Sequence, residues 1–376
     1  MSTSSKNCSL SIELLPEFGW SIKNQPVYGP GSVFQGFVKL NFDTELPIER
    51  VRLAFYAIET IPPFDISPGV IRSVRKPLFS VQSVLWDSKQ TLKLSQKSSH
   101  VFPFTIQMPM VQFPPSIDHS TYSCCFRLIA LLDTPTLDCT TIKEEVPILC
   151  MPFVETSLLK TPTFWNAKKG DLSAELRMAA QEFVPGDNIS ITLRVNNKNG
   201  SSKKKSTNSL HYVTVHIKLI QTLTVSAFDD VPNQSKTVAA VSSKLLLINS
   251  LDGCGTYCDG DLSLKLPYDL CPSYDYSKLA NISYRLQLTV EQKGPMGGIW
   301  NYSVSVDNIS ITVGTLGYGI RTSNELKLYS DIEESTSSIM SPQFMKAIEY
   351  EDSLPLYDAS KLPDYESTSI QSTATF

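Results

Sequence analysis

Apolar and polar residues alternate along most of the chain up to residue 316. A clear example is the run 189–195, in which every second residue is apolar and the residues between are polar. A period of two points successive side chains to opposite faces of an extended strand, so each run predicts a strand with one buried face. No stretch of comparable length has a helical period. The same alternation occurs at 51–57, 213–219, 262–266, 304–306 and 309–313.

The two halves of this region carry the same landmarks in the same order. A Pro-Gly pair opens a strand in each half, with an offset of 155 residues, and an arginine stands 18 residues beyond a later Met-Pro or Leu-Pro pair. Repetition at this spacing predicts two tandem β-sandwiches of about 150 residues each, of the immunoglobulin type. The matched landmarks are Pro30-Gly31 and Pro185-Gly186, strands 51–57 and 213–219, and Arg127 and Arg285.

The Pro-Gly pairs have a local conformational meaning. Proline at the second position and glycine at the third suit a type II turn, whose third residue needs a positive φ. We therefore expect a tight turn at each pair. The segment 152–162 breaks the alternation and contains prolines at both ends. It predicts a short linker between a first domain at 1–152 and a second at 163–316.

Residues 317–376 differ in composition from the two predicted domains. From Ser323 to the end there are ten Asp and Glu against three Lys, a net charge of −7, which leaves +3 for the part before it. Such a polar, acidic segment buries too little apolar surface to fold alone, so we expect a disordered tail. The weak positive charge of residues 1–322 does not predict a nucleic-acid-binding protein, because such proteins normally have a clustered positive face.

The tail carries a short motif twice. Leu354-Pro355-Leu356-Tyr357 and Leu362-Pro363-Asp364-Tyr365 lie eight residues apart. Proline holds the backbone near polyproline II, which aromatic grooves of WW-type domains accept at low ordering cost. Proline and tyrosine would be the anchors in each motif. The alternatives are chance occurrence, made less plausible by the second copy, and tyrosine phosphorylation read by arginine clusters. The predicted WW-binding residues are Leu354, Pro355, Tyr357, Leu362, Pro363 and Tyr365.

Two basic clusters are candidate contacts for cargo or lipid. Either could meet an acidic cytosolic peptide or an anionic leaflet, at roughly 1 kcal/mol per basic residue near a charged membrane. The alternative is that each is simply a solvated loop. The clusters are Arg72, Arg75 and Lys76 in the first domain and Lys203, Lys204 and Lys205 in an expanded loop of the second.

Enzyme, metal and export signals are missing from the sequence. There is no Gly-x-Ser-x-Gly, no phosphate-binding glycine loop and no histidine pair at metal spacing. Cys254 and Cys258 lack the second ligand pair of a zinc site, so we expect free thiols, no metal and no cofactor. The start lacks the features of a signal peptide, and no run reaches the roughly 18 apolar residues of a membrane span. We expect a cytoplasmic protein without catalytic activity.

Several of these segments resemble the arrestin family. Residues 28–38, 51–59, 100–106 and 126–128 resemble the arrestin N-domain, and 183–187 with 283–286 resemble the C-domain. Together with the tail motifs, the chain is similar to α-arrestins, the arrestin-related trafficking adaptors best represented in fungi. Leucine stands at the first motif position in both copies, a variant that the family uses.

The resemblance implies a mechanism. The sandwiches would recognise the cytosolic parts of a membrane transporter or receptor, and the tail would recruit a HECT-type ubiquitin ligase through its WW domains. Ubiquitin on the cargo would direct endocytosis. Recruitment to the plasma membrane and endosomes, peripheral membrane contact, and ubiquitination of the adaptor itself are further implications. The alternatives are a retromer-type sorting subunit or receptor-desensitising arrestin acting without a ligase, and a secreted lectin-like sandwich.

Overall fold

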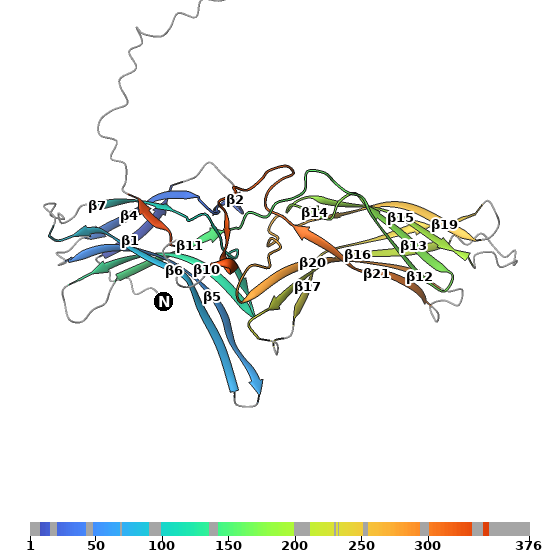
Figure 1. The fold of residues 1–376 in the computed structure, drawn as a ribbon, viewed down its shortest axis with the longest axis horizontal. Coiled ribbons are helices and arrows are strands. Elements are labelled where there is room, and N and C mark those ends of the chain that lie inside the picture. Colours follow the sequence, from blue (N-terminus) through green and yellow to red (C-terminus); the bar gives the residue numbers. More distant parts are fainter. Residues whose placement is uncertain are drawn as a thin grey trace, which may run out of the picture.

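The structure is a computed structural model of the 376-residue chain. Strands form two domains that lie end to end, and no α-helix occurs in the ranges described (Figure 1). The described residues are 8–15, 21–42, 48–67, 70–89, 99–134, 142–198, 211–228, 231, 233–250, 255–293, 301–332 and 341–345.

The first domain is a sandwich of two mainly antiparallel sheets. One sheet has the order β1-β4-β7-β23, and the other has the order β2-β3-β11-β10-β5-β6, with β9 paired to β10. The strands of the first sheet are β1 (Cys8–Leu14), β4 (Val33–Phe42), β7 (Ser99–Gln107) and β23 (Gln343–Met345). Those of the second are β2 (Ser21–Ile22), β3 (Gln25–Tyr28), β11 (Ile142–Cys150), β10 (Tyr122–Asp133), β5 (Arg50–Ser67), β6 (Val70–Asp87) and β9 (Ile117–His119).

The second domain is also a sandwich of two mainly antiparallel sheets. Its sheets have the orders β12-β13-β15-β19-β18 and β14-β21-β20-β16-β17, and β14 joins β21 in parallel as β3 joins β11. The strands are β12 (Thr163–Lys169), β13 (Leu172–Met178), β14 (Glu182–Phe183), β15 (Asn188–Asn197), β16 (Tyr212–Val225), β17 (Gln234–Leu246), β18 (Ile248–Asn249), β19 (Thr256–Lys265), β20 (Ala280–Lys293) and β21 (Asn301–Val313). The prediction of two tandem β-sandwiches is confirmed.

The apolar positions predicted from the alternation form the cores. In β15, residues 189, 191, 193 and 195 are all buried, while residues 188, 190, 192 and 194 are exposed. The first core is aromatic: the ring centroid of Phe55 lies 5.5 Å from that of Phe34 and 5.0 Å from that of Phe79. Offset and edge-on packing of such rings adds to the free energy gained by burying them.

Both predicted Pro-Gly turns are present. Gly31 has φ of 72° and Gly186 has φ of 90°. In each turn the backbone N–H of the fourth residue donates a hydrogen bond to the carbonyl of the first. Ser32 donates to Gly29 at 3.2 Å, and Asp187 donates to Val184 at 3.0 Å. Glycine reaches this left-handed conformation without the steric cost that a Cβ imposes.

Strands β5 and β6 extend beyond their sheet as a projecting hairpin. Each is 18 residues long, but β5 pairs with β10 only as far as Thr60. In the described residues 61–67 and 70–74 the two strands pair only with each other, and they stand out from the middle of the molecule (Figure 1). We call residues 61–67 and 70–76 the arm, with Arg75 and Lys76 at its base, where they pair with Thr60 and Glu59.

The segment after the second domain begins differently from the predicted tail. Residues 317–332 and 341–345 return to the domains: β22 (Lys327–Leu328) pairs in parallel with β8 (Val111–Gln112), and a 3₁₀ turn, η2 (Tyr329–Asp331), follows it. Strand β23 then adds to the edge of β7. These short pieces are held by a neighbouring strand edge, which a local composition argument does not detect. Residues 346–376 lie outside the described part.

Candidate functional site

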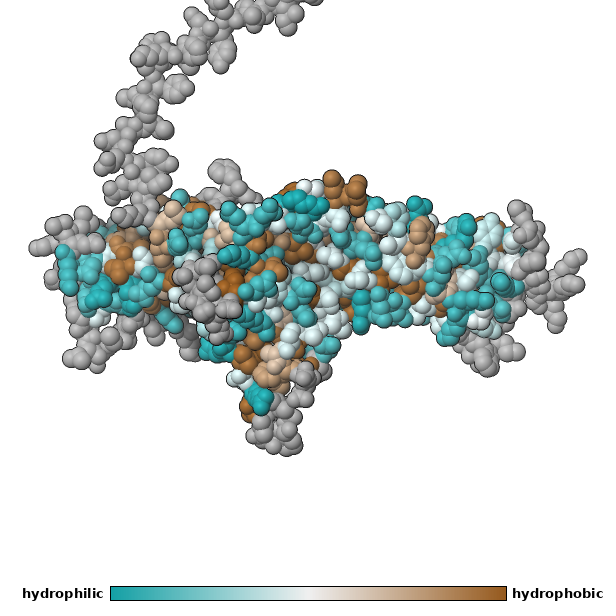
Figure 2. Space-filling view, in the orientation of Figure 1, coloured by the Kyte–Doolittle hydropathy of each residue, from teal (hydrophilic) through white to brown (hydrophobic). Residues whose placement is uncertain are grey.

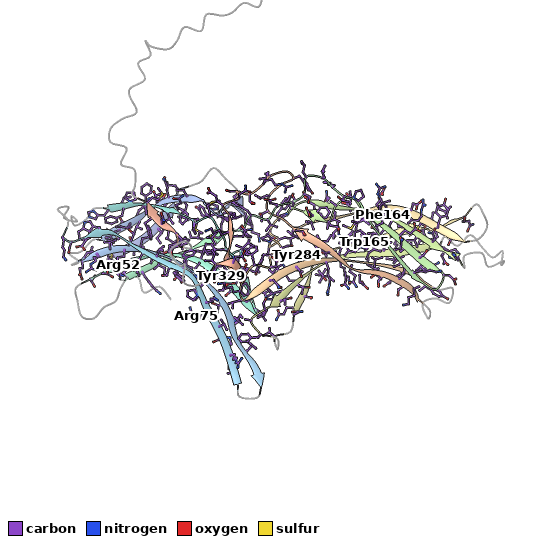
Figure 3. The ribbon with its side chains drawn as sticks, in the orientation of Figure 1. Arg52, Arg75, Phe164, Trp165, Tyr284 and Tyr329 are labelled. Atoms are coloured by element: carbon purple, nitrogen blue, oxygen red, sulfur yellow. The ribbon has the colours of Figure 1, made fainter. Side chains whose placement is uncertain are left out.

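The arm carries one of the two predicted basic clusters. Arg72 and Arg75 are exposed and Lys76 is half-buried, all on β6 at or near the base of the arm. The neighbouring Ile71 is 67% exposed. Apolar surface accompanies the described part of the arm in the space-filling view (Figure 2), and Arg75 lies at the base of the arm (Figure 3). A projecting element with exposed cations and an exposed aliphatic side chain is suited to contact another surface.

The second domain braces the arm. The ring of Phe228, which follows β16, lies 5.2 Å from the ring of Phe64 on β5. The guanidinium carbon of Arg72 lies 5.8 Å from the centroid of the same Phe228 ring. An arginine over an aromatic face is attracted by the ring quadrupole, by about 0.5–1 kcal/mol at an exposed site. The position of the arm is therefore linked to the second domain.

A buried polar cluster lies at the base of the arm. The side chain of Glu59 on β5 is fully buried, and its Oε1 accepts hydrogen bonds from the hydroxyls of Tyr122, at 2.6 Å, and Ser277. Ser277 belongs to the second domain, in residues 270–279, which we call the junction loop. Burial raises the pKa of the Glu59 carboxyl, while the two hydrogen bonds and the charges of Lys76 and Lys278 oppose that shift.

The next residue of the junction loop, Lys278, holds the returning chain. Its Nζ donates to the carbonyl of Ile332 at 2.9 Å and lies 5.0 Å from the centroid of the Tyr329 ring. Tyr329 is buried and also contacts Phe113 of the first domain, with centroids 5.9 Å apart. Tyr329 lies where the two domains meet (Figure 3). We call residues 323–332 the strap, because they contact both domains.

The linker is hydrogen-bonded to the end of the second domain. Glu155 accepts from the backbone N–H and hydroxyl of Thr322, at 2.8 and 2.6 Å, and from Arg321 at 2.8 Å. These bonds lower the pKa of the Glu155 carboxyl to about 2. On the other side, the side-chain amide of Gln112 makes two hydrogen bonds to the backbone of Phe153. The linker thus fixes the domains to each other rather than acting as a free tether.

The structure places only some of the predicted site residues. Arg72, Arg75 and Lys76 lie together on the arm, whereas the lysine cluster 203–205 and both tail motifs lie outside the described residues. Sequence reasoning missed Glu59, although a signal existed: Glu59 continues the buried parity of 51, 53, 55 and 57 in β5. A carboxyl group at a core position of a strand is uncommon and usually has a specific partner. Its partner, Ser277, carried no sequence signal.

The expected free thiols are present among the described residues: Cys8, Cys124, Cys125, Cys150, Cys258 and Cys271 form no disulfide there. No group of three or more potential metal ligands occurs within the described ranges. In the same ranges, no helix is long and apolar enough to cross a bilayer.

One comparison with known proteins gives a match. Residues 168–318 match the family model described as "Arrestin (or S-antigen), C-terminal domain". The matched range covers β13 to β21 and nearly all of the second sandwich. A search of curated proteins gives no match. The family-model match supports an arrestin-type second domain, and the first sandwich has a similar strand order.

Proposed function

We propose that this protein is an α-arrestin-type trafficking adaptor that joins a HECT-type ubiquitin ligase to a membrane transporter or receptor. The two Leu-Pro-x-Tyr motifs of the tail bind WW domains of the ligase, and the two sandwiches bind a cytosolic part of the cargo. Ubiquitin transferred to the cargo then directs its endocytosis and sorting. The observation that carries the proposal is the motif pair on a chain whose second domain matches the arrestin model.

The family match favours an adaptor over an enzyme. Arrestin-family proteins are generally adaptors without catalytic activity, and their fold supports a role in trafficking. A fold alone does not define a function, so the role of this chain has to be argued from its own surfaces and sites. In this chain the candidate cargo surface is the arm, with Arg72, Arg75 and Lys76, which suits an acidic cytosolic segment or an anionic leaflet.

The position of β23 supports a short reach for the ligase. Met345 is fixed at the edge of β7, and Leu354 follows nine residues later. A fully extended chain spans at most about 3.3–3.6 Å per residue, so the first motif, which ends at Tyr357, stays within roughly 43 Å of that edge. The second motif, which ends at Tyr365, stays within about 72 Å. A bound ligase would therefore remain close to the first domain and to cargo held there.

Two weak sites close together also compensate for each other. A short disordered peptide binds weakly because it must be ordered in a small interface. Eight flexible residues span about 15 Å root-mean-square, so a second motif remains near the ligase after the first dissociates. This raises the effective concentration and the residence time of the complex. Both motifs together should therefore bind much more tightly than either alone.

The test uses the full-length chain and the WW-domain region of a HECT-type ligase. Single changes Tyr357→Ala and Tyr365→Ala should each weaken binding, and the double change should abolish it, because tyrosine is an anchor of each motif. Tyr350→Ala is the matched control, since Tyr350 lies in the same tail but outside both motifs. Binding can be measured by pull-down and by surface plasmon resonance.

The same experiment separates the alternative. A sorting subunit or receptor-desensitising arrestin that acts without a ligase would bind none of these WW domains, with or without the tyrosines. Normal binding by the double variant would refute the proposed role of the motifs. A cargo that is internalised equally in cells with the double variant would refute the adaptor mechanism even if the ligase binds.

A further inference from the structure

Glu59 stands at a structural boundary. It is one residue before the last β5 residue that pairs with β10, so it lies where the arm leaves the sheet. Its hydrogen-bond partner Ser277 comes from the other domain, 218 residues away in sequence. Register irregularities in the β5–β6 ladder occur on both sides, between Ala57 and Ile58 and between Ile61 and Phe64. A change at Glu59 therefore acts on both the arm and the domain interface.

The junction loop presents the Ser277 hydroxyl in a fixed position. Its oxygen accepts hydrogen bonds from the backbone N–H groups of Leu279, at 3.1 Å, and Ala280, at 3.2 Å. Because these two bonds occupy both acceptor positions of the hydroxyl oxygen, the hydroxyl takes part in further hydrogen bonding only as a donor, and it donates to Glu59. The loop is itself anchored in the second domain, where Ser273 exchanges hydrogen bonds with the backbone of Val313. Ser277 is thus a pre-positioned donor.

The two oxygens of Glu59 have different surroundings. Oε1 accepts from Ser277 and Tyr122, whereas Oε2 is buried and has no hydrogen-bond partner among the described residues. An ionised carboxylate spreads its charge over both oxygens, and a buried oxygen without donors would carry much of it at high cost. In the neutral acid the carbonyl oxygen takes both donors and the proton resides on the other oxygen, where it has no acceptor among the described residues; leaving a neutral hydroxyl unpaired costs less than leaving a charged oxygen unpaired. The geometry fits the neutral acid better.

The charged and titratable groups around Glu59 are compatible with a neutral acid at this position. Lys76 approaches from β6 and Lys278 from the junction loop, while Tyr122 and Cys124 on β10 and Tyr274 on the loop face it as neutral groups. Lys278 donates to the Ile332 carbonyl and lies over the Tyr329 ring, so its ammonium group already has partners outside this cluster. Burial raises the pKa of Tyr122, Cys124 and Tyr274 as well.

We propose that Glu59, Tyr122 and Ser277 form a proton-dependent latch that couples the arm to the second domain. The latch is closed while Glu59 is a neutral acid. Loss of its proton to solvent leaves a carboxylate that requires water, the junction loop separates from β5, and the arm becomes free to move away from its brace at Phe228. This inference goes beyond the proposed adaptor role and does not depend on ligase binding.

The direction of the pH dependence follows from the raised pKa of Glu59. A group with a higher pKa in the closed state than in the open state stabilises the closed state at low pH. That stabilisation is lost as pH rises through the closed-state pKa. Between the open-state pKa and the closed-state pKa, one titrating proton increases the opening constant by at most about tenfold per pH unit, and above the closed-state pKa the opening constant no longer changes. The latch is therefore expected to open on alkalinisation and to close on acidification.

Hydrogen–deuterium exchange on the full-length protein tests the latch between about pH 5 and pH 8. Glu59→Gln keeps the shape and the acceptor oxygen but cannot ionise. Dividing the exchange rate of the wild type by that of Glu59→Gln at each pH removes the intrinsic pH dependence of exchange. We expect this ratio to rise with pH, by up to about tenfold per unit, for amides of the junction loop and the described part of the arm.

Two further variants complete the test. Glu144→Gln neutralises an exposed carboxylate on β11. Its exchange rates, divided by those of Glu59→Gln, should equal the values for the wild type at every pH. Ser277→Ala removes the donor from the second domain, so the junction loop should exchange faster at low pH and lose its pH-dependent rise. A ratio for Glu59→Gln that stays constant with pH would overturn the proposal. So would a Ser277→Ala protein whose exchange keeps the full wild-type dependence.

Discussion

The strap offers a sharp test of how the returning chain holds the two domains. Tyr329 is 2% exposed, and it contacts Phe113 in the first domain and the ammonium group of Lys278 in the second. Changing Tyr329 to Ala removes a buried ring, and truncations of this size cost about 3–5 kcal/mol. The contact with Lys278 adds roughly 0.5–2 kcal/mol. Because an exposed strap can relax after the change, we expect a loss of about 3 kcal/mol in docking free energy.

Limited proteolysis measures this docking directly. Trypsin can cleave after Lys327 only when the strap detaches, because β22 is paired with β8 and the Lys327 N–H donates to the carbonyl of Met110 at 3.0 Å. When opening is fast, cleavage follows the population of the open form. A loss of about 3 kcal/mol raises that population by roughly two orders of magnitude. We therefore expect cleavage after Lys327 to be about 100-fold faster in Tyr329→Ala.

The control is Tyr302→Ala on β21, where the tyrosine is 56% exposed and its loss should leave cleavage after Lys327 unchanged. Cleavage can be followed by mass spectrometry of the released fragment. Equal rates in the wild type and Tyr329→Ala would show that the strap is not held by this side chain, and the role assigned to the Tyr329 contacts would be refuted.

Two further predictions concern the arm and the linker. Reversing charge in Arg72→Glu with Arg75→Glu should weaken binding to cargo peptides or anionic vesicles, by about tenfold or more at low salt, whereas Lys168→Glu with Lys169→Glu on β12 should not. Equal loss in both double variants would assign the effect to net charge alone. Glu155 has a pKa lowered to about 2, so the stability that it contributes is present above about pH 4.5 and is lost as pH falls through 2. Thr322→Val removes one of its donors and should raise the midpoint pH of acid unfolding measured by circular dichroism; an unchanged midpoint would contradict the assigned role.

The sequence determined the local structure of the body. A period of two assigns each side chain of a strand to one of two faces, which is why the buried positions of β15 follow from the alternation alone. The turns at Gly31 and Gly186 followed equally from local chemistry, since each depends on a Pro-Gly pair and a single positive φ. The repeat then indicated two similar domains, because similar patterns that recur in the same order indicate repeated structural units.

The tertiary structure alone decided how distant segments meet. The inward direction of Glu59 could have been inferred from its parity in β5, but its hydrogen bond to Ser277 joins residues 218 positions apart. Strand β23 has only three residues and no periodic signal, and its partner is the edge of β7. Tyr329 lies in a polar stretch and is buried only because Phe113 and Lys278 meet there. Such contacts depend on the packing of both domains, and local patterns carry no information about that packing.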